Sequence, residues 1–286
     1  MSLIKIAVLA CIQGAAELLP VSSSAHVIVA AKLMGLDPTS PELTLLLVML
    51  HTGTMFAVIA FFWQSWKKHY FSSSQVFWNF AKLVMVATLF TGAIGLILKS
   101  FIERFVFGDV PHAEVEMLFG NLTLIGIALA AVGLFIIYAG VRSNRLPNSA
   151  DLGLLSSSWI GTMQGLCLPF RGFSRSGATI STGLVMGIDK ERLEEFSFAL
   201  AVVLTPAVIG REVLRLLKAH TGSLAQGAST VALFSPSLLG MVFSFVAGLL
   251  ALRWLSRWLE QGRWQLFGFY CLVAAAAALV LKGRGF

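Results

Sequence analysis

Charged residues are scarce in this chain of 286 residues, and their scarcity excludes an ordinary soluble domain. Only 12% of the residues are Asp, Glu, Lys or Arg, whereas soluble domains carry about 25%. Hydrophobic residues make up 57% of the chain, and the mean hydropathy is +0.83. Several apolar runs exceed the roughly 18 residues that indicate a membrane-spanning helix. These properties predict an all-α integral membrane protein.

Cysteine is also rare, and the first residues lack the features of a removed signal peptide. Cys11, Cys167 and Cys271 are scattered through apolar segments, and their spacing fits neither a disulfide framework nor a metal site. We interpret them as small core residues. The first ten residues lack a polar cleavage region, so a removed signal peptide is not expected. The net charge of +7 indicates contact with anionic lipid headgroups, and no nucleic acid is expected as a partner.

Two related halves make up the chain. Gln13-Gly14 matches Gln164-Gly165, and Met34-Gly35-Leu36-Asp37 matches Met186-Gly187-Ile188-Asp189 at nearly the same offset. We predict a first repeat at 1–140 and a second at 151–281 within a single membrane domain. Each repeat would begin with two short helices, at 1–36 and 151–188, and continue with three spans. The six predicted spans are about 42–63, 76–99, 117–140, 196–217, 231–255 and 265–281.

Proline and glycine interrupt both pairs of short helices, at Pro20 and at Pro169–Gly172. Proline disfavours helix for the residue before it, and interrupted backbone at membrane depth must be buried in protein or line a wet cavity. Each pair therefore predicts a re-entrant helical hairpin. Three crossings per half invert the second half relative to the first, so we predict an inverted-topology repeat whose hairpins meet from opposite faces. Lys and Arg divide equally between the two sides, so the charges do not predict the orientation.

The first interruption carries unusual polar groups. A carboxylate at membrane depth, here Glu17, is a functional-site hypothesis by default, although a solvated position at the interface is the structural alternative. Gln13 shares its helix face, four residues earlier. The serines Ser22–Ser24 follow Pro20 at a predicted helix start, where they either cap the helix or help to bind an anion. His26 lies one turn after Ser23 and could accept its proton.

The second interruption places two arginines among hydroxyls and glycines at a helix start. This combination suits phosphate, because guanidinium binds it in bidentate fashion and glycine lets backbone donors approach. The structural alternative is an arginine paired with the glutamate of the first interruption. A weaker candidate, His51-Thr52-Gly53-Thr54, lies inside a predicted span, where its alternative role is packing. The phosphate-binding candidates are Arg171, Ser174, Arg175, Ser176 and Thr179.

At these residues the chain resembles the undecaprenyl-diphosphate phosphatases of the bacitracin-resistance family. That family's first motif, an acid or glutamine, a glutamate and Pro-Val-Ser-Ser-x-x-His, is present as Gln13, Glu17 and Pro20–His26. Its second motif, Pro-Gly-x-Ser-Arg-Ser-x-x-Thr, is present as Arg171–Thr179, and its His-x-Gly-Thr element as His51–Thr54. The chain departs from the family at Gln13, where many members have glutamate, and at Arg171, which replaces proline.

The resemblance implies an enzyme that cleaves the terminal phosphate of undecaprenyl diphosphate, recycles the lipid carrier for peptidoglycan synthesis and confers bacitracin resistance. It implies a bacterial inner-membrane protein whose site faces the periplasm, and the help of Mg²⁺ or Ca²⁺, for which Glu17 is the candidate ligand. The partners would be a polyprenyl diphosphate and membrane lipids, and a homodimer is left open.

The leading hypothesis for the mechanism is nucleophilic catalysis. Ser23 attacks the terminal phosphorus, His26 takes its proton, and Glu17 orients the imidazole. Arg175 would stabilise the transition state, while Gln13, Ser22 and Ser24 contribute to substrate binding. Two alternatives stay open. A metal-activated water could attack in the same pocket, or the protein could be a polyprenyl-phosphate flippase, because inverted repeats with broken helices are typical of secondary transporters.

Overall fold

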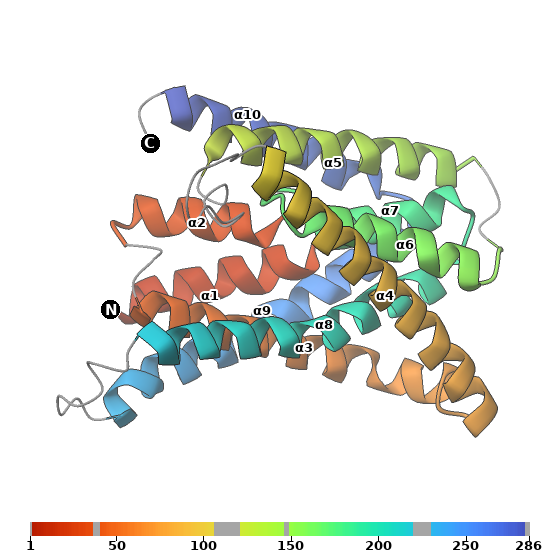
Figure 1. The fold of residues 1–286 in the computed structure, drawn as a ribbon, viewed down its shortest axis with the longest axis horizontal. Coiled ribbons are helices and arrows are strands. Elements are labelled where there is room, and N and C mark those ends of the chain that lie inside the picture. The colour runs from red at the N-terminus through yellow and green to blue at the C-terminus, as the bar shows by residue number, and fades with distance from the viewer. Residues whose placement is uncertain (1, 37–40, 106–120, 146–148, 220–229, 284–286) are drawn as a thin grey trace. The chain divides into compact units, whose positions relative to one another are not determined.

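The computed structural model describes residues 2–36, 41–105, 121–145, 149–219 and 230–283, and these residues form ten helices (Figure 1). The predicted all-α class is therefore confirmed for the described residues. In chain order the helices are α1 (Leu3–Leu18), α2 (Ser23–Leu33), α3 (Pro41–His69), α4 (Ser74–Phe105), α5 (Leu122–Ser143), α6 (Leu154–Cys167), α7 (Arg175–Val185), α8 (Lys190–Ala219), α9 (Thr230–Glu260) and α10 (Gln265–Gly283).

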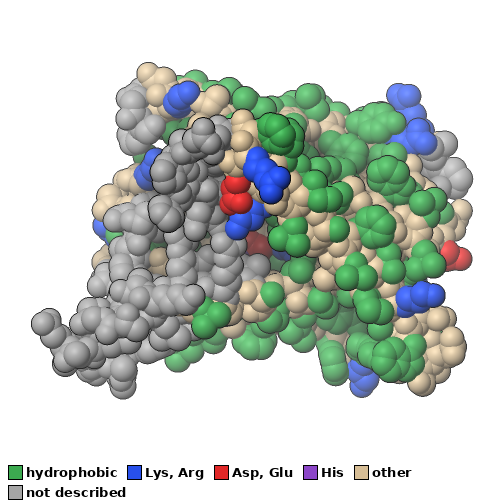
Figure 2. Space-filling view, viewed as in Figure 1, with side chains coloured by type: hydrophobic (Ala, Val, Ile, Leu, Met, Phe, Trp, Pro, Cys, Tyr) green, Lys and Arg blue, Asp and Glu red, His purple; other side chains and the backbone are tan. Residues whose placement is uncertain are grey.

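Within the described ranges, five helices are long and apolar enough to cross a membrane, so the chain is a multi-pass membrane protein. Large apolar side chains such as Leu89 of α4 and Val273 of α10 are exposed, as expected where lipid replaces water. Figure 2 shows hydrophobic side chains over much of the described surface on the face that it presents. The five candidate spans are Leu43–His69, Ser74–Phe105, Leu122–Ser143, Ser237–Glu260 and Gln265–Gly283.

The other predicted span, 196–217, lies within α8, in which the side chains of 208, 211–213 and 215–219 are not described. Residues 117–120 of the third predicted span lie outside the described residues. Six crossings and their inverted arrangement therefore stay a prediction.

Both predicted interruptions fall between helices. The first helix of each pair, α1 or α6, ends before the predicted break, and the second, α2 or α7, begins after it. In the first pair the break covers Leu19–Ser22, and in the second it covers Leu168–Ser174. The chemistry-bearing motifs therefore lie at helix ends, where backbone N–H and C=O groups lack partners within the helix.

The helices divide into two compact units, and each unit contains segments of both halves of the sequence. The first unit consists of Met1–Leu18, Ser23–Trp63 and Ala201–Leu255. The second consists of Leu19–Ser22, Gln64–Leu200 and Ser256–Phe286.

In the first unit, α1, α2 and α3 share a buried apolar core. A Cβ atom at Gly14 of α1 would lie 2.6 Å from the carbonyl oxygen of Ser244 on α9, so glycine allows these two helices to pack closely. The Ser244 hydroxyl also donates a hydrogen bond of 2.9 Å to the carbonyl of Leu50 on α3. The core residues are Ile6, Leu9, Ala10, Val27, Ala31, Leu43, Leu46 and Leu50.

In the second unit, α5 lies alongside α10 (Figure 1). The side chain of Asn121 caps α5 by accepting hydrogen bonds from the N–H groups of Thr123 and Leu124, at 3.0 and 3.3 Å. Buried residues on α5 recur every three or four positions, which is the period of a single helix face. These residues include Ile125, Leu129, Val132, Ile136 and Ala139.

Candidate functional site

Glu17 is the acceptor around which the first motif is arranged. It lies in the last turn of α1, and its Oε2 accepts a hydrogen bond of 3.1 Å from Nε2 of Gln13, one turn earlier on the same helix. The hydroxyl of Ser23, at the start of α2, donates a hydrogen bond of 2.5 Å to the same oxygen. A hydrogen bond to an ionised carboxylate is shorter and stronger than a neutral one. The contact therefore places the Ser23 hydroxyl where it can transfer its proton to a carboxylate base.

His51 is a further partner of Glu17. Its Nε2 lies 3.6 Å from Glu17 Oε2, and its Nδ1 is 2.8 Å from the carbonyl oxygen of Leu47. Because a carbonyl can only accept, Nδ1 carries a proton and the imidazole orientation is set by its own helix, α3. The sequence ranked this histidine as a weak candidate. Its position in the His-x-Gly-Thr element was the one sequence feature that indicated a functional role.

The predicted base, His26, and the neighbouring Ser24 lie in the first turns of α2, and both are half-buried. The structure brings Glu17, Gln13 and Ser23 together. The described hydrogen bond of the Ser23 hydroxyl goes to the carboxylate, so the step from Ser23 to His26 stays a prediction.

The residues between α1 and α2, 19–22, belong to the second unit, and one of them has a strained backbone. Ser22 has a φ of +67° and is the one non-glycine residue with a positive φ among the described residues. Such conformations cost on the order of 1–3 kcal/mol and concentrate at functional sites. The carbonyl of Leu19 accepts a hydrogen bond of 3.3 Å from the hydroxyl of Ser176, and that of Pro20 accepts one of 3.2 Å from the thiol of Cys271. Within the second unit, Leu19 and Pro20 are thus bonded to α7 and α10.

The second motif forms the N-terminus of α7. Ser174 is the N-cap, and its side chain accepts a hydrogen bond of 3.2 Å from the N–H of Gly177. Its hydroxyl oxygen lies 3.4 Å from that of Ser176, and both residues are buried. Positive partial charge and unpaired N–H groups at a helix N-terminus favour an anion such as phosphate.

The other predicted phosphate ligands differ in their surroundings. Arg171 and Arg175 are half-buried beside this helix end. Thr179 is fully buried, and its hydroxyl donates a hydrogen bond of 2.9 Å to the Arg175 carbonyl. The same hydroxyl lies 2.6 Å from that of Ser197 on α8. Thr179 therefore already ties α7 to α8, which is a positioning role.

Gly172 shapes the loop that leads into α7. Its φ is +102°, and a Cβ atom there would lie 2.5 Å from the Ile125 carbonyl oxygen. Both conditions exclude an ordinary side chain. The glycine of the motif therefore lets the loop pass close to α5.

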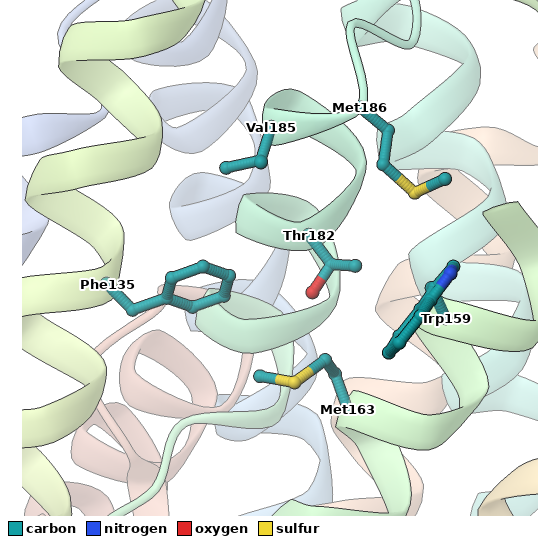
Figure 3. Close-up of a pocket in the computed structure, with 6 residues that line it drawn as sticks. All are labelled: Phe135, Trp159, Met163, Thr182, Val185 and Met186. Carbon is teal, nitrogen blue, oxygen red and sulfur yellow. The ribbon is translucent and has the colours of Figure 1, made fainter.

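An apolar groove runs beside the same helix. It has a volume of about 280 Å³ and is lined by residues of α5, α6 and α7 together with Met186, the residue that follows α7. Figure 3 shows Phe135 and Trp159 on opposite sides of the groove, with Thr182 between them. The remaining lining residues are Met163, Val185 and Met186.

Metal-ligating side chains gather at a different place. Within the described residues, one group of three or more such side chains has its ligand atoms within 4.8 Å of one another, and it consists of His69, Glu191 and Glu195. None of these residues was a predicted site residue. The predicted metal ligand, Glu17, instead has Gln13, Ser23 and His51 among its described neighbours.

Long apolar helices, with polar motifs at two helix breaks, define a multi-pass membrane protein. The sequence matches the family described as "Bacitracin resistance protein BacA" over residues 6–277. This chain belongs to the BacA family, and the resemblance inferred from its motifs is confirmed.

Similar proteins cover the chain almost completely. Undecaprenyl-diphosphatase 2 of Acinetobacter baylyi is 58% identical over 286 residues, which is 98% of each chain. The undecaprenyl-diphosphatase of Desulfosudis oleivorans is 33% identical over 97% of each chain. That of Rhodopirellula baltica is 29% identical over 99% of each.

Proposed function

We propose that this chain is an undecaprenyl-diphosphatase, which hydrolyses undecaprenyl diphosphate to undecaprenyl phosphate and inorganic phosphate. The observation that carries the proposal is the 2.5 Å hydrogen bond from the Ser23 hydroxyl to Glu17 at a broken helix. It supplies a nucleophile with an adjacent base, in a chain that is 58% identical to a protein of that name.

In the proposed mechanism Ser23 Oγ attacks the terminal phosphorus and its proton passes to Glu17. The bond from phosphorus to the bridging oxygen breaks, and undecaprenyl phosphate leaves. Water then hydrolyses the phosphoserine, which releases phosphate and restores the hydroxyl. Glu17 is the direct acceptor in this scheme because it receives the described hydrogen bond. His26 stays the proposed second group for proton transfer. His51, when both of its ring nitrogens carry protons, would stabilise the Glu17 carboxylate at 3.6 Å.

The second motif would hold the phosphate groups. The start of α7 offers backbone N–H donors, and Ser174, Ser176 and the guanidinium of Arg175 add to them. These donors would stabilise the charge that develops on the phosphoryl oxygens. Ser176 also donates a hydrogen bond to the carbonyl of Leu19 within the second unit. That both motifs act on one diphosphate is proposed from the sequence motifs. Further proposed contacts come from Gln13, Ser22, Ser24 and Arg171.

A divalent cation is compatible with this donor set. Hard cations such as Mg²⁺ are commonly held by one or two carboxylates together with substrate phosphates, and Glu17 would provide the carboxylate. When bound, the ion would neutralise phosphate charge, and Gln13 would orient the carboxylate through its 3.1 Å hydrogen bond.

We further propose the topology that the repeats predict: two inverted halves at 1–140 and 151–281, each with a re-entrant hairpin and three spans. The protein would lie in the bacterial inner membrane with its site towards the periplasm. The sequence similarity between the two halves and the matching pairs of short helices support this arrangement.

Phosphate release in detergent micelles tests the proposed activity. Purified protein should release phosphate from undecaprenyl diphosphate, and Arg175→Ala should lower kcat/KM by about 10²–10³, because a charge-assisted clamp on the transition state is lost. Lys99→Ala, which removes a cation of α4 paired with Glu103, is the control and should retain activity. Lipid flipping needs two sides of a membrane, so a protein that flips lipid without hydrolysing it would release no phosphate in micelles.

The groove beside α7 would take the first isoprenoid units of the lipid. It is apolar, and it lies along the helix whose N-terminus would bind the phosphates. Thr182 is seven residues after Arg175, which is about 10 Å along a helix. The lipid tail could therefore continue directly from the headgroup.

Filling the groove should impair the long substrate selectively. We expect Val185→Trp to lower kcat/KM about tenfold for undecaprenyl diphosphate and to leave the short farnesyl diphosphate nearly unaffected. Val273→Trp, at an exposed position of α10, controls for the added bulk. An equal loss with both substrates would contradict a role for the groove in binding the tail.

A further inference from the structure

A second polar cluster lies at the end of α3 and the start of α8, within the second unit. Nδ1 of His69 lies 2.8 Å from Oε1 of Glu195. Glu191 precedes Glu195 by one helical turn, so both carboxylates share one face of α8. One ligand atom of each residue lies within 4.8 Å of the other two. The site that we propose for the diphosphate uses none of these side chains.

The Glu195 carboxylate is buried and only half satisfied. Its side chain is 1% exposed, and Oε1 accepts a hydrogen bond from the hydroxyl of Ser65. The other oxygen, Oε2, is buried and has no hydrogen bond of ordinary geometry in the described protein, although the Tyr70 hydroxyl interacts with this carboxylate. A buried, unpaired carboxylate oxygen is costly. This oxygen is therefore a position at which a bound cation would lower the cost of burial.

Two side chains of α3 contact the cluster and hold it in place. Trp66, on the last turns of α3, donates a hydrogen bond of 3.3 Å from Nε1 to the carbonyl oxygen of Glu195. The hydroxyl oxygen of Ser65 also lies 3.3 Å from His69 Nδ1. The end of α3 and the start of α8 are thus already fastened together, and a ligand would meet a prearranged set of donors.

The local charge favours a cation. Glu191 and Glu195 carry two negative charges, which the neighbouring Arg192 offsets only in part. The guanidinium of Arg192 lies 5.5 Å from the centre of the Tyr70 ring. Two carboxylates against one guanidinium leave the group with a net negative formal charge.

We propose that His69, Glu191 and Glu195 form a binding site for a divalent transition-metal ion such as Zn²⁺. A mixed set of one imidazole and two carboxylates suits zinc or manganese better than Mg²⁺ or Ca²⁺, which prefer oxygen ligands alone. Ligand bonds of about 2.0–2.2 Å place two ligand atoms of one zinc ion about 3–3.5 Å apart, so small side-chain rotations would complete the site. The ion would join the end of α3 to the start of α8.

Cobalt is a suitable probe, because its visible absorption reports the ligands and Zn²⁺ displaces it. We expect the full-length protein in detergent, with the exposed Cys11 replaced by serine, to bind one Co²⁺ at neutral pH. Glu191→Gln should weaken binding at least about tenfold, since the loss of even an outer-shell partner costs that much. Glu191 is exposed, so this variant should fold. His69→Asn should have a similar effect.

Two controls separate this site from the proposed catalytic site. Glu103→Gln removes another glutamate of the same unit, paired with Lys99 at 3.6 Å, and should leave Co²⁺ affinity unchanged. Glu17→Gln should abolish phosphatase activity but retain Co²⁺ binding. The proposal is overturned if the protein binds no Co²⁺, if Glu191→Gln binds it as tightly as the parent, or if millimolar Mg²⁺ displaces it as readily as Zn²⁺. In the last case a hard-cation site would replace it.

Discussion

Replacing Ser23 by alanine should reduce phosphate release from undecaprenyl diphosphate by at least about 10²–10⁴ in kcat, the range that covalent and acid–base groups typically contribute. The hydroxyl that would attack phosphorus is removed, while the start of α2 loses only one oxygen atom. Because the substrate is held mainly by the second motif in this scheme, KM should change little. The measurement is steady-state phosphate release in detergent micelles.

Ser158→Ala is a matched control for this change. Ser158 lies on α6, and its hydroxyl donates a hydrogen bond of 2.8 Å to the carbonyl of Leu154 within the same helix. Its loss should leave kcat within about twofold. A rapid-quench experiment with labelled substrate should show a phosphoserine in the parent protein. If Ser23→Ala retained more than about a tenth of the activity, Ser23 could not be the obligatory nucleophile, and metal-activated water would become the better mechanism.

The second large effect is expected for Glu17→Gln, which keeps the shape of the side chain and removes its charge. Glu17 Oε2 accepts hydrogen bonds from Gln13 and Ser23 and lies 3.6 Å from His51. An amide is not a base, and it would present a donor to at least one of these groups. We expect kcat to fall by about 10²–10⁴, with the fold retained according to the thermal unfolding midpoint.

A double-mutant cycle decides whether Glu17 acts through Ser23. If the carboxylate is the base for this hydroxyl, Ser23→Ala combined with Glu17→Gln should be little worse than either change alone, because residues that act as a unit give strongly non-additive effects. Fully multiplicative losses would instead indicate that Glu17 works through a bound cation or on the leaving group. His51→Gln in the same cycle should have a smaller effect, since His51 acts on the carboxylate and not on the substrate.

Composition and local pattern predicted the helical membrane class, the two interruptions and the residues at them. Apolar runs of spanning length and the breaks at Pro20 and Pro169–Gly172 depend only on neighbouring residues. They can therefore be predicted from the sequence without knowledge of the tertiary structure. The proximity of Gln13 and Glu17, which are joined by a hydrogen bond, could be predicted in the same way, because positions four apart on a helix share a face. The helical hairpin then brings Ser23 to the carboxylate six residues away.

Contacts between distant segments could not be predicted in this way. His51 faces Glu17 because α3 packs on α1, and no periodicity within either helix specifies that neighbour. The strained φ of Ser22 and the bond from Ser176 to Leu19, 157 positions apart, likewise depend on packing. The pair of His69 and Glu195 spans 126 positions, and each residue reads by itself as an ordinary polar residue near a helix end. Helix periodicity is a local property, whereas the partners of a buried polar group are set by which helices pack together.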